Sequence, residues 1–221
     1  MDSAEAKKKR AALAALDYIP PGASLGVGTG STVEHLIDAL PSIADQLGPI
    51  VSSSVATTEK LQALGLDVTD LNSVGDIDVY IDGADEATKH LQLIKGGGGA
   101  LTREKILAAA ARRFICIIDD SKLVGMLGSF PLPIEVIPMA QSYVARQIIR
   151  SRGQPIWRED YVTDNSNHII DVHNLQIANP VEMESRIGQL AGVVTVGLFA
   201  QRPADVLLVG DDSDSVRKIE R

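Results

Sequence analysis

Short apolar runs alternate with helical stretches along the first two-thirds of the chain. The apolar runs have the length and bounding turn residues of buried strands, at residues 24–27, 50–53, 77–81 and 114–118. Helices are predicted between them, at residues 11–19, 31–40, 57–64 and 102–112. Strands that alternate with helices require crossover connections, so this pattern predicts an α/β fold with a Rossmann-like, mainly parallel sheet.

The pattern changes after residue 130. A strand is predicted at 131–137 and a helix at 141–150, followed by a hairpin of strands 156–162 and 168–172 around the polar residues Asp164–Asn167. Asn179 followed by Pro180 predicts the start of a helix that ends near Gly192, and residues 193–199 form the last strand. This β-α-β-β-α-β order is the ferredoxin-like arrangement.

We therefore expect two domains. Residues 204–209 form one more apolar strand, which is expected to return to the first sheet. The first domain then comprises residues 1–129 plus 202–221 and forms an α/β domain. Residues 130–201 form an inserted ferredoxin-like α+β domain.

Composition and charge limit the partners of the protein. The 221 residues are 45% hydrophobic and 23% charged, which is typical of a folded globule. Twenty-one Lys and Arg residues against 29 Asp and Glu residues give a net charge of −8. Such a chain repels nucleic acid and anionic membranes, so we predict neither as a partner, although one local basic pocket can still bind a small anion.

The single cysteine and the N-terminal residues bear on location. Cys116 excludes an intramolecular disulfide and a multi-cysteine metal site, and its apolar neighbours predict a buried strand thiol. No apolar stretch approaches the ~18 residues of a membrane span, and no apolar signal region follows the N-terminal charges. We expect a cytoplasmic protein, with residence in an organelle left open.

The first candidate for chemistry is the glycine-rich turn Gly26–Thr32 between a predicted strand and helix. Free N–H groups at a helix start favour an anion. Ser31 occupies the position of the third glycine in a dinucleotide fingerprint, and the acidic residue expected about 20 positions later is missing. The turn suits a single phosphate, and the alternative is a tight turn with Ser31 or Thr32 as a helix cap.

Two further clusters follow the next strand. Asp82 and Asp85 lie where parallel sheets bind ligands, beyond the carboxyl end of a strand, although a polar surface turn would use the same residues. Lys95 then precedes four consecutive glycines, whose entropic cost is justified where backbone approaches a ligand. Glu104 falls in the first turn of the following helix, either as a functional acid or as a partner of the helix dipole.

A metal site is not predicted. His35 and His90 are the nearest histidines to the acidic cluster, and neither has a useful spacing. His168 and His173 fall in the predicted hairpin, where structural roles are expected. The three clusters together supply a phosphate site, paired carboxylates and a lysine with a separate glutamate, which suits proton transfer on a phosphorylated polyol.

These clusters resemble, in order and spacing, the signature of type A ribose-5-phosphate isomerases, as do Phe130–Val136 and Gly192–Phe199. The resemblance implies interconversion of ribose 5-phosphate and ribulose 5-phosphate in the pentose phosphate pathway, without metal or organic cofactor, by a homodimer or homotetramer. It also implies that residues 1–129 plus 202–221 form the catalytic domain and that residues 130–201 mediate oligomerisation. By the same resemblance, Glu104 is the base that moves a proton between C2 and C1 through an enediolate.

The resemblance also implies the other site residues. Asp82 and Asp85 would handle hydroxyl protons and ring opening, and Lys95 would stabilise negative charge on oxygen. The remaining substrate contacts would be Thr29, Gly30, Ser31, Thr32, Gly83, Ala84, Gly96, Gly97, Gly98, Lys122 and Lys8. Burial and the nearby aspartates should raise the pKa of Glu104 against the opposing effect of the helix start.

Two residues depart from the family pattern, and two other functions compete. Val55 stands where an acidic residue is expected, and Gly99 where alanine is common. A non-catalytic sugar-phosphate sensor on a related fold is the main alternative. An acyl or CoA transferase with Glu104 as nucleophile is the second, and it would require a covalent adduct.

Overall fold

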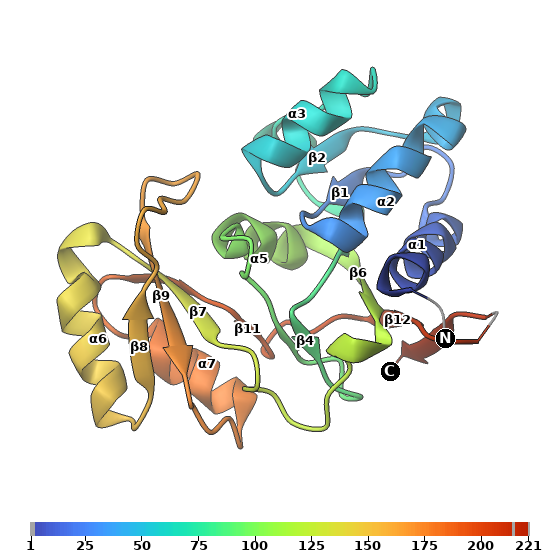
Figure 1. Cartoon of the computed structure of the whole chain (residues 1–221). Coiled ribbons are helices and arrows are strands. Elements are labelled where there is room, and N and C mark those ends of the chain that lie inside the picture. Colours follow the sequence, from blue (N-terminus) through green and yellow to red (C-terminus); the bar gives the residue numbers. More distant parts are fainter. Residues whose placement is uncertain (1–2, 214, 221) are drawn as a thin grey trace.

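The fold is built around a six-stranded sheet, seen in a computed structural model that describes residues 3–213 and 215–220 (Figure 1). Its strands are β1 (Leu25–Val27), β2 (Ile50–Ser52), β3 (Ile77–Asp82), β6 (Ala111–Asp119), β12 (Val206–Gly210) and β13 (Arg217–Glu220). Their order is β13-β12-β6-β3-β1-β2, and only the β12–β13 pair is antiparallel within this sheet. The mainly parallel sheet is confirmed, including the return of the chain through β12.

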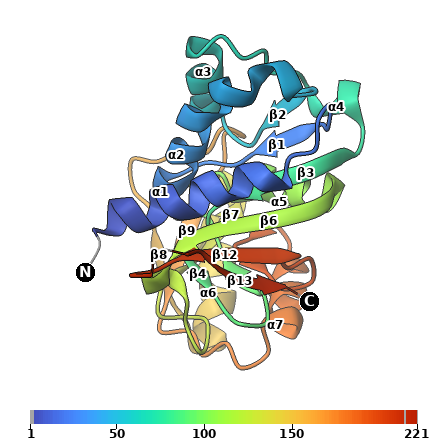
Figure 2. The ribbon, with the colours of Figure 1, turned by 90° about the vertical axis from the view of Figure 1, so that its right-hand side faces the viewer.

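Helices cover both faces of this sheet. The helices of the first part of the chain are α1 (Ala4–Ala15), α2 (Ser31–Ala39), α3 (Val55–Ala63), α4 (Leu71–Val74) and α5 (Leu101–Ala110). Small residues of α1 and apolar residues of α2 pack on one face with alternate strand residues such as Ile115 and Ile117. Figure 2 shows α1 lying across β6, and on the other face Leu107 of α5 packs with Phe114 and Cys116. Cys116 is fully buried, as predicted.

The second sheet has the ferredoxin-like arrangement. Its elements are β7 (Leu132–Val136), α6 (Gln141–Arg150), β8 (Gln154–Trp157), β9 (His168–His173), α7 (Pro180–Gly188) and β10 (Val193–Val196). All its strand pairs are antiparallel, in the order β10-β7-β9-β8. Residues of α6 and α7 form one core with the inner side chains of the sheet, and Asn179 caps α7 as predicted.

A small third sheet joins these two parts. It consists of β4 (Glu86–Ala87), β5 (Leu93–Ile94) and β11 (Leu198–Phe199) in the order β11-β5-β4. The single strand predicted at 193–199 is therefore wrong, because Gly197 divides it between two sheets. Gly197 donates its N–H to the Pro133 carbonyl at 2.8 Å and accepts from the Lys95 N–H at 2.9 Å. A side chain at residue 197 would collide with Pro133 and with the backbone of Lys95. Glycine at this position therefore allows the Lys95 backbone to pack closely where the two sheets meet.

Several predicted boundaries are also corrected. The first helix begins seven residues before residue 11, at Ala4, where the Ser3 hydroxyl accepts from the Ala6 N–H at 3.2 Å. The helix predicted to reach Gly192 ends at Gly188. The strand predicted at 156–162 ends at Trp157, so residues 158–167 form a loop that extends towards the first sheet.

Candidate active site

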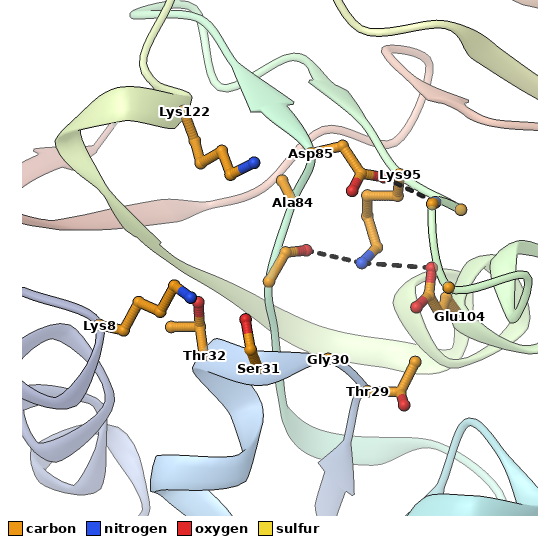
Figure 3. Close-up of a pocket in the computed structure, with 14 residues that line it drawn as sticks. Lys8, Thr29, Gly30, Ser31, Thr32, Ala84, Asp85, Lys95, Glu104 and Lys122 are labelled. Carbon is orange, nitrogen blue, oxygen red and sulfur yellow. Dashed lines mark hydrogen bonds and ion pairs between the residues drawn. The ribbon is translucent and has the colours of Figure 1, made fainter. Parts of the chain in front are cut away.

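A cavity of about 210 Å³ lies beyond the carboxyl ends of β1 and β3 (Figure 3). It is lined by Lys8, Thr29, Gly30, Ser31, Thr32, Gly83, Ala84, Asp85, Lys95, Gly96, Gly97, Gly98, Glu104 and Lys122. All three clusters singled out from the sequence meet here. Of the predicted site residues, only Asp82 does not line the cavity.

The first glycine turn opens α2 towards the cavity. Gly30 is the N-cap with φ of 111°, a left-handed value that glycine adopts readily, and no side chain caps the helix. The alternative that Ser31 or Thr32 caps α2 is therefore wrong, since both lie within the first turn. Both residues line the cavity at the start of α2, where the helix N-terminus would stabilise an anion (Figure 3).

Two lysines make this end of the cavity basic. Lys8 comes from α1 and lies beside Thr32, while Lys122 faces it from the short turn Asp120–Lys122 (Figure 3). The Lys8 ammonium also lies 2.7 Å from a Glu5 carboxylate oxygen. A chain of net charge −8 thus places two cations at the helix start that favours an anion.

Asp82 lies behind the cavity wall, fully buried at the end of β3. Its Oδ1 accepts from the backbone N–H groups of Thr29 at 3.1 Å and Gly83 at 2.7 Å, and the Tyr80 hydroxyl donates to Oδ2. A Cβ on Gly28 would collide with this carboxyl group. The structure therefore gives Asp82 no direct contact with the cavity, and its free side faces Lys95.

Lys95 is buried between carboxylates. Its Nζ lies 2.7 Å from Asp82 Oδ2 and 3.3 Å from Glu104 Oε2, and it donates to the Gly83 carbonyl at 2.6 Å. Burial lowers the pKa of Lys95, but the carboxylates of Asp82 and Glu104 outweigh this effect and raise it overall. The ammonium therefore stays charged at the edge of the cavity.

Glu104 lies in the first turn of α5 and is only 3% exposed. Its Oε2 has no hydrogen-bond donor within the described part of the chain, although the Lys95 ammonium lies nearby. Burial, opposed by Lys95 and reinforced by Asp82, raises the pKa of Glu104 from the usual 4.5 to about 8. The raised pKa is as predicted. Glu104 also lies in the first turn of α5, where a carboxylate complements the helix dipole, so both interpretations of this residue fit its position.

Asp85 joins the segment after β3 to the glycine turn before α5. Its Oδ2 accepts from the Gly97 N–H at 2.8 Å, and burial raises its pKa despite this bond. The glycine turn itself needs left-handed backbone at Gly96, with φ of 108°, and at Gly99, with φ of 85°. Three of the four glycines, Gly96, Gly97 and Gly98, thus bring backbone to the cavity wall, as their entropic cost suggested.

The two departures from the family pattern have local explanations. The Val55 N–H donates to Asp164 Oδ2 at 2.9 Å, so a carboxylate of the 158–167 loop lies at this helix start. A Cβ on Gly99 would collide with the Tyr161 side chain of the same loop. Sequence analysis missed Tyr80 and the 158–167 loop. For Tyr80 a signal existed, because it precedes Asp82 by two residues on one strand face.

The other candidates have structural surroundings. The His35 ring lies 3.0 Å from Glu5, and the His168 ring contacts Gln141 at 2.7 Å and packs on Trp157. Within residues 3–213 and 215–220 no group of three potential metal-ligating side chains occurs. No helix in these ranges has the length and apolar character to cross a membrane.

The α/β fold and a buried acid–base pair beside an anion site define an enzyme that moves protons on a small phosphorylated substrate. A family model described as ribose 5-phosphate isomerase A (phosphoriboisomerase A) matches residues 49–214. The chain belongs to this family, whose members are isomerases of ribose 5-phosphate, and it carries the corresponding fold. The resemblance noted in the sequence is confirmed.

Solved structures agree along the whole chain. Ribose 5-phosphate isomerase A from Neisseria gonorrhoeae is 42% identical with a TM-score of 0.97, covering 100% of this chain and 98% of that one. A ribose 5-phosphate isomerase from Methanocaldococcus jannaschii is 34% identical with a TM-score of 0.93, covering 99% and 100%. A D-ribose-5-phosphate isomerase in complex with phospho-erythronic acid is 36% identical with a TM-score of 0.94, covering 100% of both chains.

Proposed function

We propose that this cavity interconverts D-ribose 5-phosphate and D-ribulose 5-phosphate by general-base catalysis through an enediolate. One observation carries the proposal: a buried Glu104 of raised pKa lies 3.3 Å from a charged lysine, at a cavity with a basic end. The phosphate would bind at the start of α2 between Lys8 and Lys122. The binding of phospho-erythronic acid by a relative supports a sugar-phosphate ligand.

The residues divide the chemistry among them. The Glu104 carboxylate removes the C2 proton of the open-chain aldose, and the C–H electrons form the C1–C2 double bond as negative charge develops on O1. The Lys95 ammonium stabilises that charge. The O2 hydroxyl proton then passes to O1, and Glu104 returns its proton to C1, so that a C2 ketone and a C1 hydroxymethyl group are formed. Asp85 contacts the sugar hydroxyls, and Asp82 keeps Lys95 charged and in place.

The proposed reaction is tested by mixing the purified protein with ribose 5-phosphate and chelator and following ketose formation. The proposal predicts turnover without added metal. Absence of ketose despite sugar-phosphate binding would favour the sensor, for which no present observation speaks. A covalent adduct on Glu104 after incubation with coenzyme A thioesters would instead support the transferase.

Replacing the lysine at the phosphate end should weaken substrate binding. In Lys122→Ala we expect KM to rise about 10- to 100-fold with kcat little changed, because a charge-assisted hydrogen bond contributes roughly 1.5–3 kcal/mol. Steady-state kinetics measure this split. Lys60→Ala, a surface lysine outside the cavity, should leave both constants unchanged. An unaltered KM in Lys122→Ala would remove this lysine from the site.

The raised pKa of Glu104 predicts the pH dependence. The base acts only when ionised, so kcat/KM should increase with pH and level off above about 8. The substrate phosphate titrates near pH 6 and does not account for an increase between pH 7 and 8. Lys122→Ala should keep this increase because it leaves Glu104 in place. A plateau from pH 6 upwards would contradict the assignment.

The proposal also includes the organisation of the molecule. We place the catalytic site on the domain formed by residues 1–129 and 202–221, and self-association as a homodimer or homotetramer on residues 130–201. Exposed apolar side chains on that domain, including Met139, Ile149 and Trp157, support an interface, which light scattering tests. The metabolic character of the family supports a cytoplasmic location, which fractionation of the source cells tests.

A further inference from the structure

The loop of residues 158–167, which joins β8 and β9, contacts the glycine turn that lines the cavity. Arg158 donates from Nη1 to the Gly97 carbonyl at 3.1 Å, and the Tyr161 hydroxyl donates to the Gly98 carbonyl at 3.0 Å. Both donors belong to the inserted part of the chain, and neither lines the 210 Å³ cavity. The glycine turn is thus held from its outer side.

The Arg158 guanidinium is held in place by contacts other than those to the glycine turn. Its Nε and Nη2 donate to the two carboxylate oxygens of Asp171 on β9 at 2.8 and 2.6 Å. The guanidinium also lies over the Tyr161 ring, 5.4 Å from its centroid. This bidentate pair and the stacking orient the remaining N–H groups towards Gly97.

Tyr161 fits the turn closely because residue 99 is glycine. Its ring and hydroxyl occupy the space that a Cβ at Gly99 would need. A second cavity of about 110 Å³ beside the first is lined by both Tyr161 and Gly98, and the two cavities share Thr29 and Gly98. Tyr161 therefore packs directly against the part of the turn that borders the substrate cavity.

Holding a carbonyl fixes the neighbouring N–H. In a planar trans peptide the C=O of one residue and the N–H of the next point in opposite directions. With the Gly97 carbonyl turned to Arg158, the Gly98 N–H points away from the loop, and it has no acceptor among the described residues. Gly98 is exposed and lines the cavity, so this N–H is available to a ligand there.

We propose that Arg158 and Tyr161 are positioning residues. Arg158 holds the Gly97 carbonyl outward, so that the Gly98 N–H donates to a substrate oxygen, and Tyr161 holds the following peptide, whose Gly99 N–H closes the turn on the Gly96 carbonyl at 2.9 Å. The proposal rests on the assignment of the cavity as the sugar-phosphate site. It makes the inserted domain part of the substrate site through two side chains that never touch the substrate. The glycine turn without them would sample conformations in which the N–H is misdirected.

The kinetic split distinguishes positioning from a purely structural role. In Arg158→Met and Tyr161→Phe we expect KM to rise, about 10-fold and about 3-fold, with kcat within threefold of wild type, because lost hydrogen bonds weaken substrate binding. Partial unfolding would instead lower kcat at constant KM. Phospho-erythronic acid, titrated calorimetrically, should lose affinity by the same factors. Arg158→Lys, which keeps the charge beside Asp171, should restore part of the affinity.

Arg202 provides the matched control. It donates to the carbonyls of Ala108 and Ala111 and pairs with Asp205, away from the cavity. Arg202→Met should lower stability but leave KM and analogue affinity unchanged. Unchanged KM and affinity in both Arg158→Met and Tyr161→Phe would overturn the inference. Tyr161→Phe removes a single oxygen atom, so it still tests the inference if Arg158→Met folds poorly. Failure of the wild type to form ketose would instead refute the proposed reaction.

Discussion

Glu104→Gln is expected to lower kcat by about 10²–10⁴-fold while KM changes by no more than a few-fold. The carboxamide has the shape of the carboxyl group and fits the same buried position in the first turn of α5. It cannot accept the C2 proton, so the general-base contribution is lost. Binding is retained because the phosphate end of the cavity, at Lys8 and Lys122, is untouched.

A second glutamate provides the control for this substitution. Glu184 of α7 is also buried, and it pairs with Lys105, the neighbour of Glu104 on α5. Its carboxylate accepts from the Ala200 N–H at 2.9 Å, and it does not line the cavity. Glu184→Gln should cost stability and leave kcat within about twofold. Near-normal turnover in Glu104→Gln, measured by ketose formation, would remove Glu104 from the role of base.

The location of the site could be predicted because it depends on strand order and local turns. Adjacent parallel strands β1 and β3 end at the same edge of the sheet, so Gly28 and Asp82 had to meet there. The glycines before α5 bring Lys95 and Glu104 to the same edge. These positions could be predicted because the turns are short, and because strands and helices alternate clearly in this part of the sequence.

Other features depend on contacts between distant segments and left no local pattern. The two-residue strands β4 and β5 are too short for any hydrophobic period to appear. The Asp82 side chain points to Lys95 and not into the cavity, because Gly28 and Tyr80 pack around it. Arg158 and Tyr161 reach the glycine turn only because residues about 60 positions apart in the chain meet in the fold, and no single segment encodes that contact.

The buried Lys95–Asp82 pair should respond to mutation in both stability and rate. Lys95→Met leaves Asp82 as a fully buried charge without its cation, and breaking such a pair costs about 3–5 kcal/mol. For a chain of this length the melting temperature should fall on the order of 10 °C. Turnover should fall by at least ~10²-fold, since the group that stabilises charge on O1 is absent.

Two further variants separate the contributions of stability and chemistry. Lys95→Met combined with Asp82→Asn removes both charges, so much of the lost stability should return while turnover stays low. Lys105→Met is the matched control, because Lys105 is paired with a buried glutamate and lies over the same Phe199 ring, 4.6 Å from its centroid, as Lys95 does at 5.6 Å. It should destabilise the protein without a comparable loss of kcat. If Lys95→Met melts at the wild-type temperature, then the N–H groups of Thr29 and Gly83 and the Tyr80 hydroxyl suffice to hold the Asp82 charge, and the pair serves catalysis alone.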